Sequence, residues 1–172
     1  MGISDELIQT LNDSGIDAVD AEHSKCGYHI SVSPLKDQLR TFAGIMLDTE
    51  FYLDFVTAVH VESGLQVVYQ FGHFTEGCHV NAKLFTDSGS VPTISDIFQG
   101  ANWHERETKD FYGLLFDDHP DLRVLILDED DFDLKPLLKD EKKLKALEDI
   151  TRKSVSEDKA ASAEKEDQKP GV

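Results

Sequence analysis

The chain has 172 residues, enough for one domain with a sizeable core and an appendage. It carries 34 Asp and Glu against 17 Lys and Arg, which gives a formal net charge of −17. This acidity argues against nucleic-acid binding, which needs clustered Lys and Arg, and it favours solubility and basic partners.

Cysteine usage and hydropathy exclude two further classes. Cys26 and Cys78 lie far apart and form no Cys-x-x-Cys motif, so thiolates of this chain alone cannot build an iron–sulfur or zinc cluster. No apolar run reaches transmembrane length, and the N-terminus lacks the apolar region of a signal peptide. We therefore expect a soluble, cytoplasmic chain that meets a membrane only through a partner.

Apolar spacing and turn residues predict mixed helices and strands in the first fifty residues. The expected elements are a helix over 4–11, an ambiguous segment over 16–23 that could be a strand, a strand over 28–32, and a helix over 34–47. Ser33 is the expected N-cap of the second helix, and Pro34 its first residue, because the fixed φ of proline suits that position. The core-facing stripe of this helix is expected to comprise Leu35, Leu39, Phe42 and Met46.

Residues 51–85 predict an antiparallel meander, because three segments of alternating polarity are separated by turn residues. The strands are expected over 51–61, 65–71 and 78–85. The residues expected on the buried face of the first strand are Phe51, Leu53, Phe55, Val59 and Val61. A loop over 87–90 and a short helix over 92–99 should follow.

Residues 102–113 predict a further helix. Asn102 is its expected N-cap, Glu105 stands where a capping-box carboxylate belongs, and Gly113 is the expected C′ stop. Residues 116–121 are typical of a turn. Residues 122–127 predict a short apolar strand that carries Arg123.

The charged residues of this helix allow two interpretations. Arg106 and Asp110 are four positions apart and are expected to pair, and with Trp103 they share a face with Leu114. Charges beside apolar side chains indicate a buried or interfacial network, because such charges need partners. The alternative is a solvated charged face, the commoner outcome for this spacing alone.

The whole stretch has the order Glu105-Arg106-Glu107, Asp110-Phe111-Tyr112-Gly113, His119-Pro120-Asp121-Leu122-Arg123 and Leu125-Ile126. It closely resembles the signature of the 30-kilodalton subunit of respiratory complex I, an NADH-quinone oxidoreductase. That family includes the equivalent small subunits of group 4 energy-converting nickel–iron hydrogenases. Similar landmarks lie upstream, so that the resemblance covers about residues 28–140: Ser33-Pro34, Tyr52-Leu53-Asp54-Phe55, Val67-Val68-Tyr69, the run from Val91 to Asp96, and Ala101-Asn102-Trp103.

The resemblance implies a non-catalytic, cofactor-free peripheral subunit of a complex I-type, membrane-bound, redox-driven ion-pumping oxidoreductase. Such a subunit would pack against the large subunit near the quinone site and neighbour an iron–sulfur subunit, on the cytoplasmic side of the membrane. Iron–sulfur, flavin or nickel–iron centres would lie only in the partners. The alternatives are the equivalent hydrogenase subunit and a stand-alone acidic binding module or enzyme. The signature and interface residues would be Trp103, Glu105, Arg106, Glu107, Asp110, Gly113, His119, Pro120 and Arg123.

Two positions depart from the family pattern. Leu138 stands where the Pro-Leu-Arg-Lys-Asp segment has arginine, which affects any contact that arginine makes. His60 stands where the family often has aspartate, so a polar contact there is expected to differ.

Independent chemistry is not expected from the remaining polar groups. His73 and His79 flank a turn, and His104 and His119 bracket the signature helix, but no HxxxH or HExxH spacing occurs. The carboxylates of the signature helix could serve as acid–base groups. They lack a paired nucleophile, a phosphate-binding glycine loop or a dinucleotide fingerprint.

The fold class predicted from these patterns is α+β. It comprises an antiparallel or mixed sheet of four or five strands, with helices on one face and at one end. The expected divisions are a domain over 1–128, an acidic linker with a possible partner-docking helix over 129–153, and a tail over 154–172. We expect the tail to be disordered, because its composition offers almost nothing apolar to bury.

Overall fold

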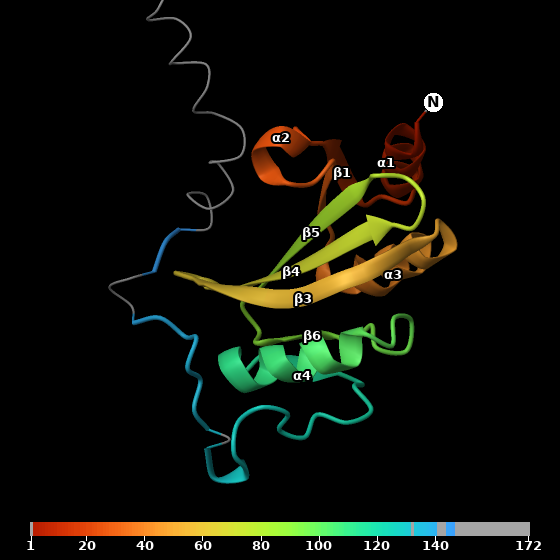
Figure 1. Ribbon diagram of the computed structural model, residues 1–172. Coiled ribbons are helices and arrows are strands. Elements are labelled where there is room, and N and C mark those ends of the chain that lie inside the picture. Colours follow the sequence, from red (N-terminus) through yellow and green to blue (C-terminus); the bar gives the residue numbers. More distant parts are fainter. Residues whose placement is uncertain (1, 132, 141–143, 147–172) are drawn as a thin grey trace, which may run out of the picture.

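The computed structural model describes residues 2–131, 133–140 and 144–146. Its elements are α1 (Ile3–Asp13), β1 (Asp17–Asp20), α2 (His23–Cys26), β2 (Ile30–Ser33), the 3₁₀ turn η1 (Lys36–Gln38), α3 (Leu39–Asp48), β3 (Phe51–Val61), β4 (Gly64–His73), β5 (His79–Thr86), β6 (Ser90–Pro92), α4 (Ala101–Tyr112), β7 (Leu115–Asp117) and the 3₁₀ turn η2 (Glu129–Asp131) (Figure 1). None of the helices in these residues has the length and apolar character needed to cross a bilayer.

One mixed sheet organises the fold. Its five strands follow the order β1-β2-β5-β4-β3, and a separate two-stranded sheet joins β6 to β7 in parallel. Within the large sheet β2 and β5 are parallel, whereas the other neighbours are antiparallel. The predicted α+β class, the mixed sheet and the β3–β5 meander are therefore confirmed.

The core lies between one face of this sheet and the helices α1 and α3. Tyr69 and Phe71 of β4 are fully buried on that face, and the ring of Phe42 from α3 meets Phe71 edge-on at 5.5 Å between ring centroids. Edge-to-face contacts of this kind add to the stabilisation from burial alone. The stripe predicted for α3 is confirmed at Leu39, Phe42 and Met46, all inaccessible to solvent.

The predicted start of the second helix is wrong. Ser33 ends β2, where it pairs with Asp17, and Pro34 precedes the helical turn rather than opening it. The N–H of Leu35 donates to the side chain of Gln38, so the helical segment begins after Leu35. Leu35 is consequently 63% exposed instead of buried.

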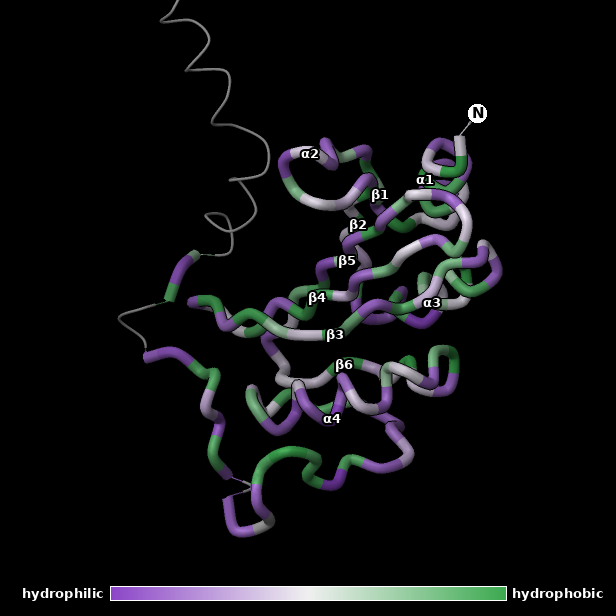
Figure 2. Tube along the Cα trace, in the orientation of Figure 1, coloured by the Kyte–Doolittle hydropathy of each residue, from purple (hydrophilic) through white to green (hydrophobic). Residues whose placement is uncertain are grey.

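A β-bulge overrides the expected alternation of β3. The register with β4 shifts between Leu53 and Phe55, where an extra residue on β3 turns the side chains that follow to the other face, although Val61 at the end of the strand is buried as predicted. Phe55 is therefore 39% exposed, while Val56 and Ala58 are buried. Figure 2 shows how hydrophobic and hydrophilic positions are distributed along β3 and β4, the two strands between which this shift lies.

The helix expected over residues 92–99 is also absent from the structure. Pro92 closes β6, and the following residues form irregular turns, with the N–H groups of Ile97 and Phe98 both donating to the carbonyl of Ile94. These turns carry Ile94 and Phe98 into the core. The reason is that Thr93 and Ile94 bond to a side chain of α4 rather than starting a helix.

The described residues after η2 run alongside α4 and then the far end of β3 (Figure 1). The N–H of Leu137 donates to the carbonyl of Phe111, and the N–H of Glu62 donates to the carbonyl of Lys145. The described parts of 133–146 contain no helix, and the predicted tail over 154–172 lies outside the described residues. His60, the departure from the family pattern, accepts the N–H of Lys139 through Nδ1, a bond that an aspartate oxygen could also make.

Gly113→Ala should destabilise the domain by about 1–2 kcal/mol, because Gly113 ends α4 with φ +75°, a conformation that L-residues disfavour. A Cβ there would also press on the side chain of Lys135. Gly100→Ala is the matched control at the other end of α4, where φ is −60° and nothing lies within 4 Å of an added Cβ. Chemical denaturation of both variants checks this. Equal losses would show that the left-handed residue is not the cause.

Candidate functional site

The signature helix α4 lies along the edge strand β3, next to the small β6–β7 sheet (Figure 1). Its polar side chains bond to two neighbouring stretches of chain. One is the loop over residues 93–96. The other is the segment over residues 121–126, which we call the strap; it is largely hydrophobic in sequence and passes below α4 (Figure 2).

The start of α4 differs from the prediction. The helix begins at Ala101, Gly100 is its N-cap, and neither Asn102 nor Glu105 forms a capping box. Glu105 instead turns into the interior, where its side chain is fully buried. The C-terminal stop at Gly113 is confirmed, with its N–H bonded to the carbonyl of Lys109.

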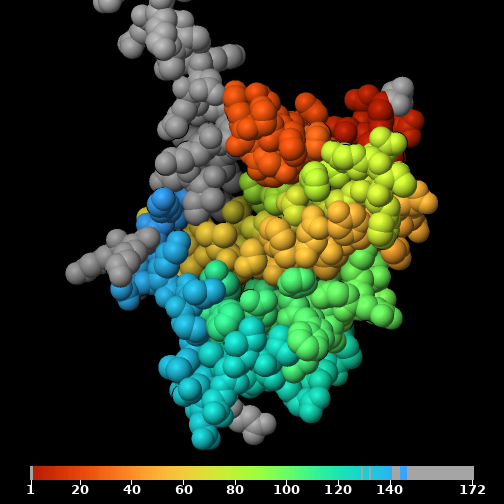
Figure 3. Space-filling model, viewed as in Figure 1, coloured from red at the N-terminus to blue at the C-terminus, as the bar shows by residue number. Residues whose placement is uncertain are grey.

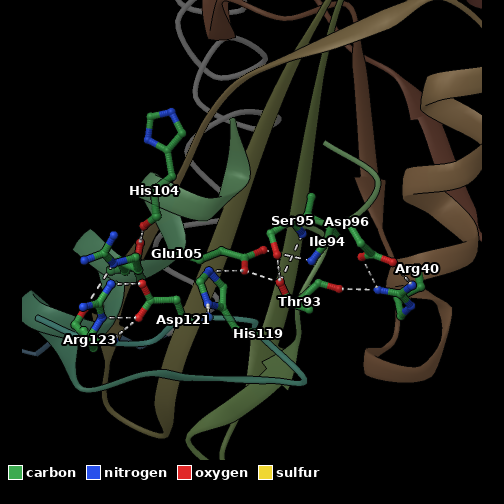
Figure 4. Close-up of polar contacts among 12 residues, drawn as sticks. Arg40, Thr93, Ile94, Ser95, Asp96, His104, Glu105, His119, Asp121 and Arg123 are labelled. Carbon is green, nitrogen blue, oxygen red and sulfur yellow. Dashed lines mark hydrogen bonds and ion pairs between the residues drawn. The ribbon is translucent and has the colours of Figure 1, made fainter. Parts of the chain in front are cut away.

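Both oxygens of Glu105 are bonded to the loop over 93–96. Oε1 accepts the N–H of Ile94 at 2.9 Å, and Oε2 accepts the hydroxyl of Thr93 at 2.5 Å (Figure 4). Thr93 in turn lies 2.8 Å from the hydroxyl of Ser95. The carboxylate therefore joins α4 to a loop that has no regular structure of its own.

Burial changes the charge state of Glu105. Removal from water disfavours the carboxylate and raises its pKa to about 7, although the bonds from Ile94 and Thr93 act in the opposite direction. The nearby hydroxyl of Tyr69 is buried with no hydrogen-bond partner among the described residues, and burial together with the charge of Glu105 holds its pKa well above the usual range. A carboxyl group that is part-protonated near neutral pH is thus built into the core.

His119 faces the same carboxyl group from the turn after β7. Its Nε2 lies 3.7 Å from Oε2 of Glu105, and both side chains are inaccessible to solvent (Figure 4). Its Nδ1 accepts the N–H of Asp121 at 3.0 Å. Burial, first among several causes, lowers the pKa of His119.

The loop over 93–96 is held from its other side by α3. Arg40 donates to both carboxylate oxygens of Asp96 at 2.8 and 2.7 Å and to the carbonyl of Thr93 at 2.7 Å. A bidentate guanidinium–carboxylate pair fixes orientation as well as distance. The loop is therefore bound to α3 by Arg40 and to α4 by Glu105.

The strap is held by cationic side chains of α4 that donate to its carbonyl groups. Arg106 donates from Nε to the carbonyl of Arg123 and from Nη2 to that of Val124, each at 3.1 Å. Lys109, one turn along, donates to the carbonyl of Leu122 at 2.6 Å. Three consecutive carbonyl groups of the strap are thus bonded to the helix.

Asp110 also holds the strap, but as an acceptor of hydrogen bonds rather than as a donor. Its Oδ2 accepts the N–H groups of Leu125 and Ile126 at 2.8 and 2.9 Å, and the residue is only 2% exposed. These bonds explain why residues 122–127 are not the predicted strand: their backbone groups bond to side chains instead of a neighbouring strand. The predicted Arg106–Asp110 pair is also wrong, because each side chain bonds to the strap rather than to the other.

The remaining signature residues lie at the surface. Trp103 is 67% exposed, and Glu107, one turn further along α4, is half-buried. Pro120 is exposed, and Arg123 makes a bidentate pair with Asp121 at 2.8 and 2.7 Å. Figure 3 shows α4 and the strap as one continuous surface below β3. The signature thus divides into groups that hold the fold and groups that face outward.

The histidines lie in separate places. His23, His29 and His79 stack at one end of the sheet, with centroids of the first two rings 4.2 Å apart, while His73 accepts backbone N–H groups of its own turn. His104 points away from the buried network around Glu105 (Figure 4). Among the residues that the structure describes, no three His, Cys, Asp or Glu side chains are placed to hold one metal ion.

Sequence reasoning missed three residues of this site: Arg40, Thr93 and Lys109. Lys109 could have been recognised, since it lies three positions after Arg106 and therefore on the same helical face. Thr93 lies within a recognised landmark but was assigned to a helix. No sequence pattern indicates a role for Arg40, because its partner Asp96 is distant in sequence.

The model of one protein family, described as the respiratory-chain NADH dehydrogenase 30-kDa subunit, matches residues 28–146. The chain belongs to this family. The match includes β2 to β7, α3, α4 and the strap, so the bonds of α4 with the loop over 93–96 and with the strap lie inside the 30-kDa subunit region.

Curated relatives match this chain over part of their length. The C subunit of NADH-quinone oxidoreductase from Xanthobacter autotrophicus is 44% identical over 80 residues, which make up 46% of this chain and 38% of that protein. The protein of the same name from Chlorobium phaeobacteroides is 44% identical over 63 residues, 37% of each chain. The aligned segments thus span well under half of these relatives.

Two solved structures share the fold. A chain of an archaeal respiratory membrane complex, the membrane-bound sulfane sulfur reductase, superposes with a TM-score of 0.68 at 23% identity, over 88% of this chain and 91% of the other. A trypsin-resistant fragment of Nqo5 gives a TM-score of 0.58 at 18% identity, over 70% of this chain and all of the fragment. At these identities the likeness supports the architecture alone.

Proposed function

We propose that this chain is a non-catalytic peripheral subunit of a complex I-type NADH-quinone oxidoreductase. The observation that carries the proposal is the use of the signature side chains. Glu105, Arg106 and Asp110 bond mainly to the backbone of the chain itself, so the groups best suited to acid–base chemistry serve to fix a surface. Family membership supports a role in an assembly rather than as a stand-alone enzyme.

The partner in this proposal is the large subunit of the oxidoreductase, with an iron–sulfur subunit beside it. The proposed contact surface is the outward side of α4 and the strap. It includes the exposed apolar side chains of Trp103 and Ile126 and the exposed guanidinium of Arg123, with half-buried Glu107 one turn after Trp103 on α4. A large aromatic residue inside a polar rim is the composition found at the centres of protein interfaces.

The chain itself would carry no redox centre, and its membrane association would come through the complex. The well-separated cysteines Cys26 and Cys78 support this part of the proposal, since iron–sulfur clusters are held by grouped thiolates. The hydrogenase alternative gains no support from the site. The curated relatives described above bear the name of the quinone-reducing enzyme.

Affinity purification of the full chain from detergent-solubilised membranes of its own cells tests the proposal. We expect the large subunit and the iron–sulfur subunit of NADH-quinone oxidoreductase at equal stoichiometry, with flavin and iron absorbance in the complex. The chain purified alone should show no such absorbance. Recovery of a nickel–iron large subunit, or of NADH-oxidising activity in the chain alone, would contradict it.

Trp103→Ala should abolish or strongly reduce recovery of the large subunit while leaving the free energy of unfolding within about 0.5 kcal/mol of the parent, because the side chain is mostly exposed. Phe74→Ala is the matched control, since Phe74 is a similarly exposed aromatic residue, 71% accessible, in the turn between β4 and β5. Purification and denaturation are measured on both variants. Equal recovery of the large subunit with Trp103→Ala and with the parent would exclude this face as the contact.

A further inference from the structure

The buried His119 ring has a definite protonation state in this structure. Because Nδ1 accepts the N–H of Asp121, it cannot carry a hydrogen, so the neutral ring bears its proton on Nε2. Among the described residues that nitrogen makes no hydrogen bond of ordinary length, and it faces Oε2 of Glu105 at 3.7 Å. The pair is therefore an acid and a base in an apolar interior, with one ring nitrogen already occupied by a backbone group.

The hydroxyls beside Glu105 can adapt to either charge state of the carboxyl group. Thr93 has one hydroxyl proton but lies within bonding distance of both Glu105 and Ser95. With Glu105 ionised, Thr93 donates to the carboxylate and Ser95 donates to Thr93. With Glu105 protonated, the carboxyl group donates to Thr93, and Thr93 donates to Ser95, so no bond needs to be lost.

His119 has no such freedom. A proton added to its ring must occupy Nδ1, where it would meet the N–H of Asp121, and that bond must break. We propose that Glu105 and His119 form a buried proton-binding latch, in which neutral His119 holds the turn at Asp121 and its protonation opens this turn by breaking the His119–Asp121 bond. The inference goes beyond the proposed function and does not depend on it.

The turn is linked to the strap by a short chain of bonds. The carboxylate of Asp121 accepts the N–H and the guanidinium of Arg123, and the carbonyl of Arg123 accepts Nε of Arg106 on α4. Loss of the His119–Asp121 bond therefore loosens Asp121, the first residue of the strap, while Lys109 and Arg106 still hold the carbonyl groups that follow it. Asp110, which binds the other end of the strap, is unaffected.

The charged and titratable groups around the latch set the order in which protons bind. Burial acts most strongly, and it disfavours both the imidazolium of His119 and the carboxylate of Glu105. The charge of Arg106 also opposes the His119 imidazolium, whereas Asp121 and the backbone of Asn102 favour it. Glu105 is influenced in addition by Asp96 and Arg40, and its own charge acts on Tyr69. The first proton therefore goes to Glu105, and the second, at lower pH, must go to His119.

Hydrogen exchange of backbone amides in the full chain, followed by NMR between pH 7.5 and 5, tests the latch. After correction for the intrinsic pH dependence of exchange, the protection factor of the Asp121 amide should fall at least tenfold as pH decreases. His119→Asn is the matched control, because an asparagine oxygen can accept an N–H two residues on but does not titrate. In that variant the protection should be independent of pH. A wild-type amide that stays protected at pH 5, or an equal loss in His119→Asn, would overturn the proposal.

Two further measurements on the wild-type chain keep the test decisive if a variant is unstable. The ¹⁵N shifts of the His119 ring at pH 7.5 should report the tautomer with hydrogen on Nε2, and a ring with hydrogen on Nδ1 would refute the latch. The ¹³C shift of the Glu105 carboxyl group should titrate at higher pH than the release of the Asp121 amide, because Glu105 takes the first proton. A carboxyl group that titrates only after the amide is released would remove Glu105 from the proposed site.

Discussion

Asp110→Ala should lower the free energy of unfolding by about 3 kcal/mol, the largest effect we expect from a single signature residue. The substitution removes the carboxylate that accepts the N–H groups of Leu125 and Ile126, and each hydrogen bond to a charged group contributes about 1.5–3 kcal/mol. Asp110→Asn keeps an oxygen that can accept these bonds and loses only the charge. It should cost about 1 kcal/mol.

Arg106→Ala should cost about 2 kcal/mol, because two strap carbonyls lose a charged donor. Arg106→Lys is its control, since an ammonium group can still donate to one of them. The double variant Arg106→Ala, Asp110→Ala should cost less than the sum of the single variants, as both residues hold the same segment and its release is shared.

Urea denaturation of these variants at one pH gives all the required free energies. A solvated charged face predicts losses below about 1 kcal/mol for each substitution. Strict additivity in the double variant would show that the strap is not released as a unit.

Glu105 should make the stability of the domain fall as pH rises from about 5 to 8. Its pKa is about 7 in the folded state against 4.5 for an ordinary glutamate, so the folded chain binds more protons than the unfolded chain between these values. Stability from this group is therefore fully present below about 4.5 and lost as pH passes 7. The complete shift corresponds to about 3 kcal/mol.

Glu105→Gln should remove this slope, because glutamine does not titrate. His119 makes an opposing contribution, because its lowered pKa favours stability at higher pH. This contribution is present in both proteins, so the difference in unfolding free energy between parent and variant isolates the contribution of Glu105. Glu107→Gln, two residues on and only half-buried, should keep the parent slope. Parallel pH profiles for the parent and Glu105→Gln would contradict the assignment.

The sequence predicted those parts of the fold that carry a regular period. The stripe at Leu39, Phe42 and Met46 recurs at helical spacing, and the three strands of the meander alternate between recognisable turns, so both follow from local pattern. The bulge after Leu53 breaks the alternation, and β3 contains no glycine or proline that would indicate a bulge. That position could not be read from the pattern.

The site was harder to predict, because its main bonds join side chains to backbone. Residues 122–127 have the composition of a strand, yet their N–H and C=O groups bond to Asp110, Arg106 and Lys109. Such bonds depend on where α4 lies, and they impose no periodic pattern on the sequence of residues 122–127. Helical spacing placed Arg106 and Asp110 on one face correctly, but it could not show that a third segment takes both of them as partners.

The position of β3 has a consequence for the behaviour of the chain outside any assembly. β3 is an edge strand of eleven residues, and its unpaired backbone would be a template for strand addition by another molecule. At the opposite edge, β1 has only four residues and begins and ends with aspartate, which discourages such pairing. The long edge is flanked by α4 and, at its far end, by the bond from Glu62 to Lys145. Substitutions that loosen α4 should therefore cause self-association before they cause global unfolding, visible as concentration-dependent light scattering.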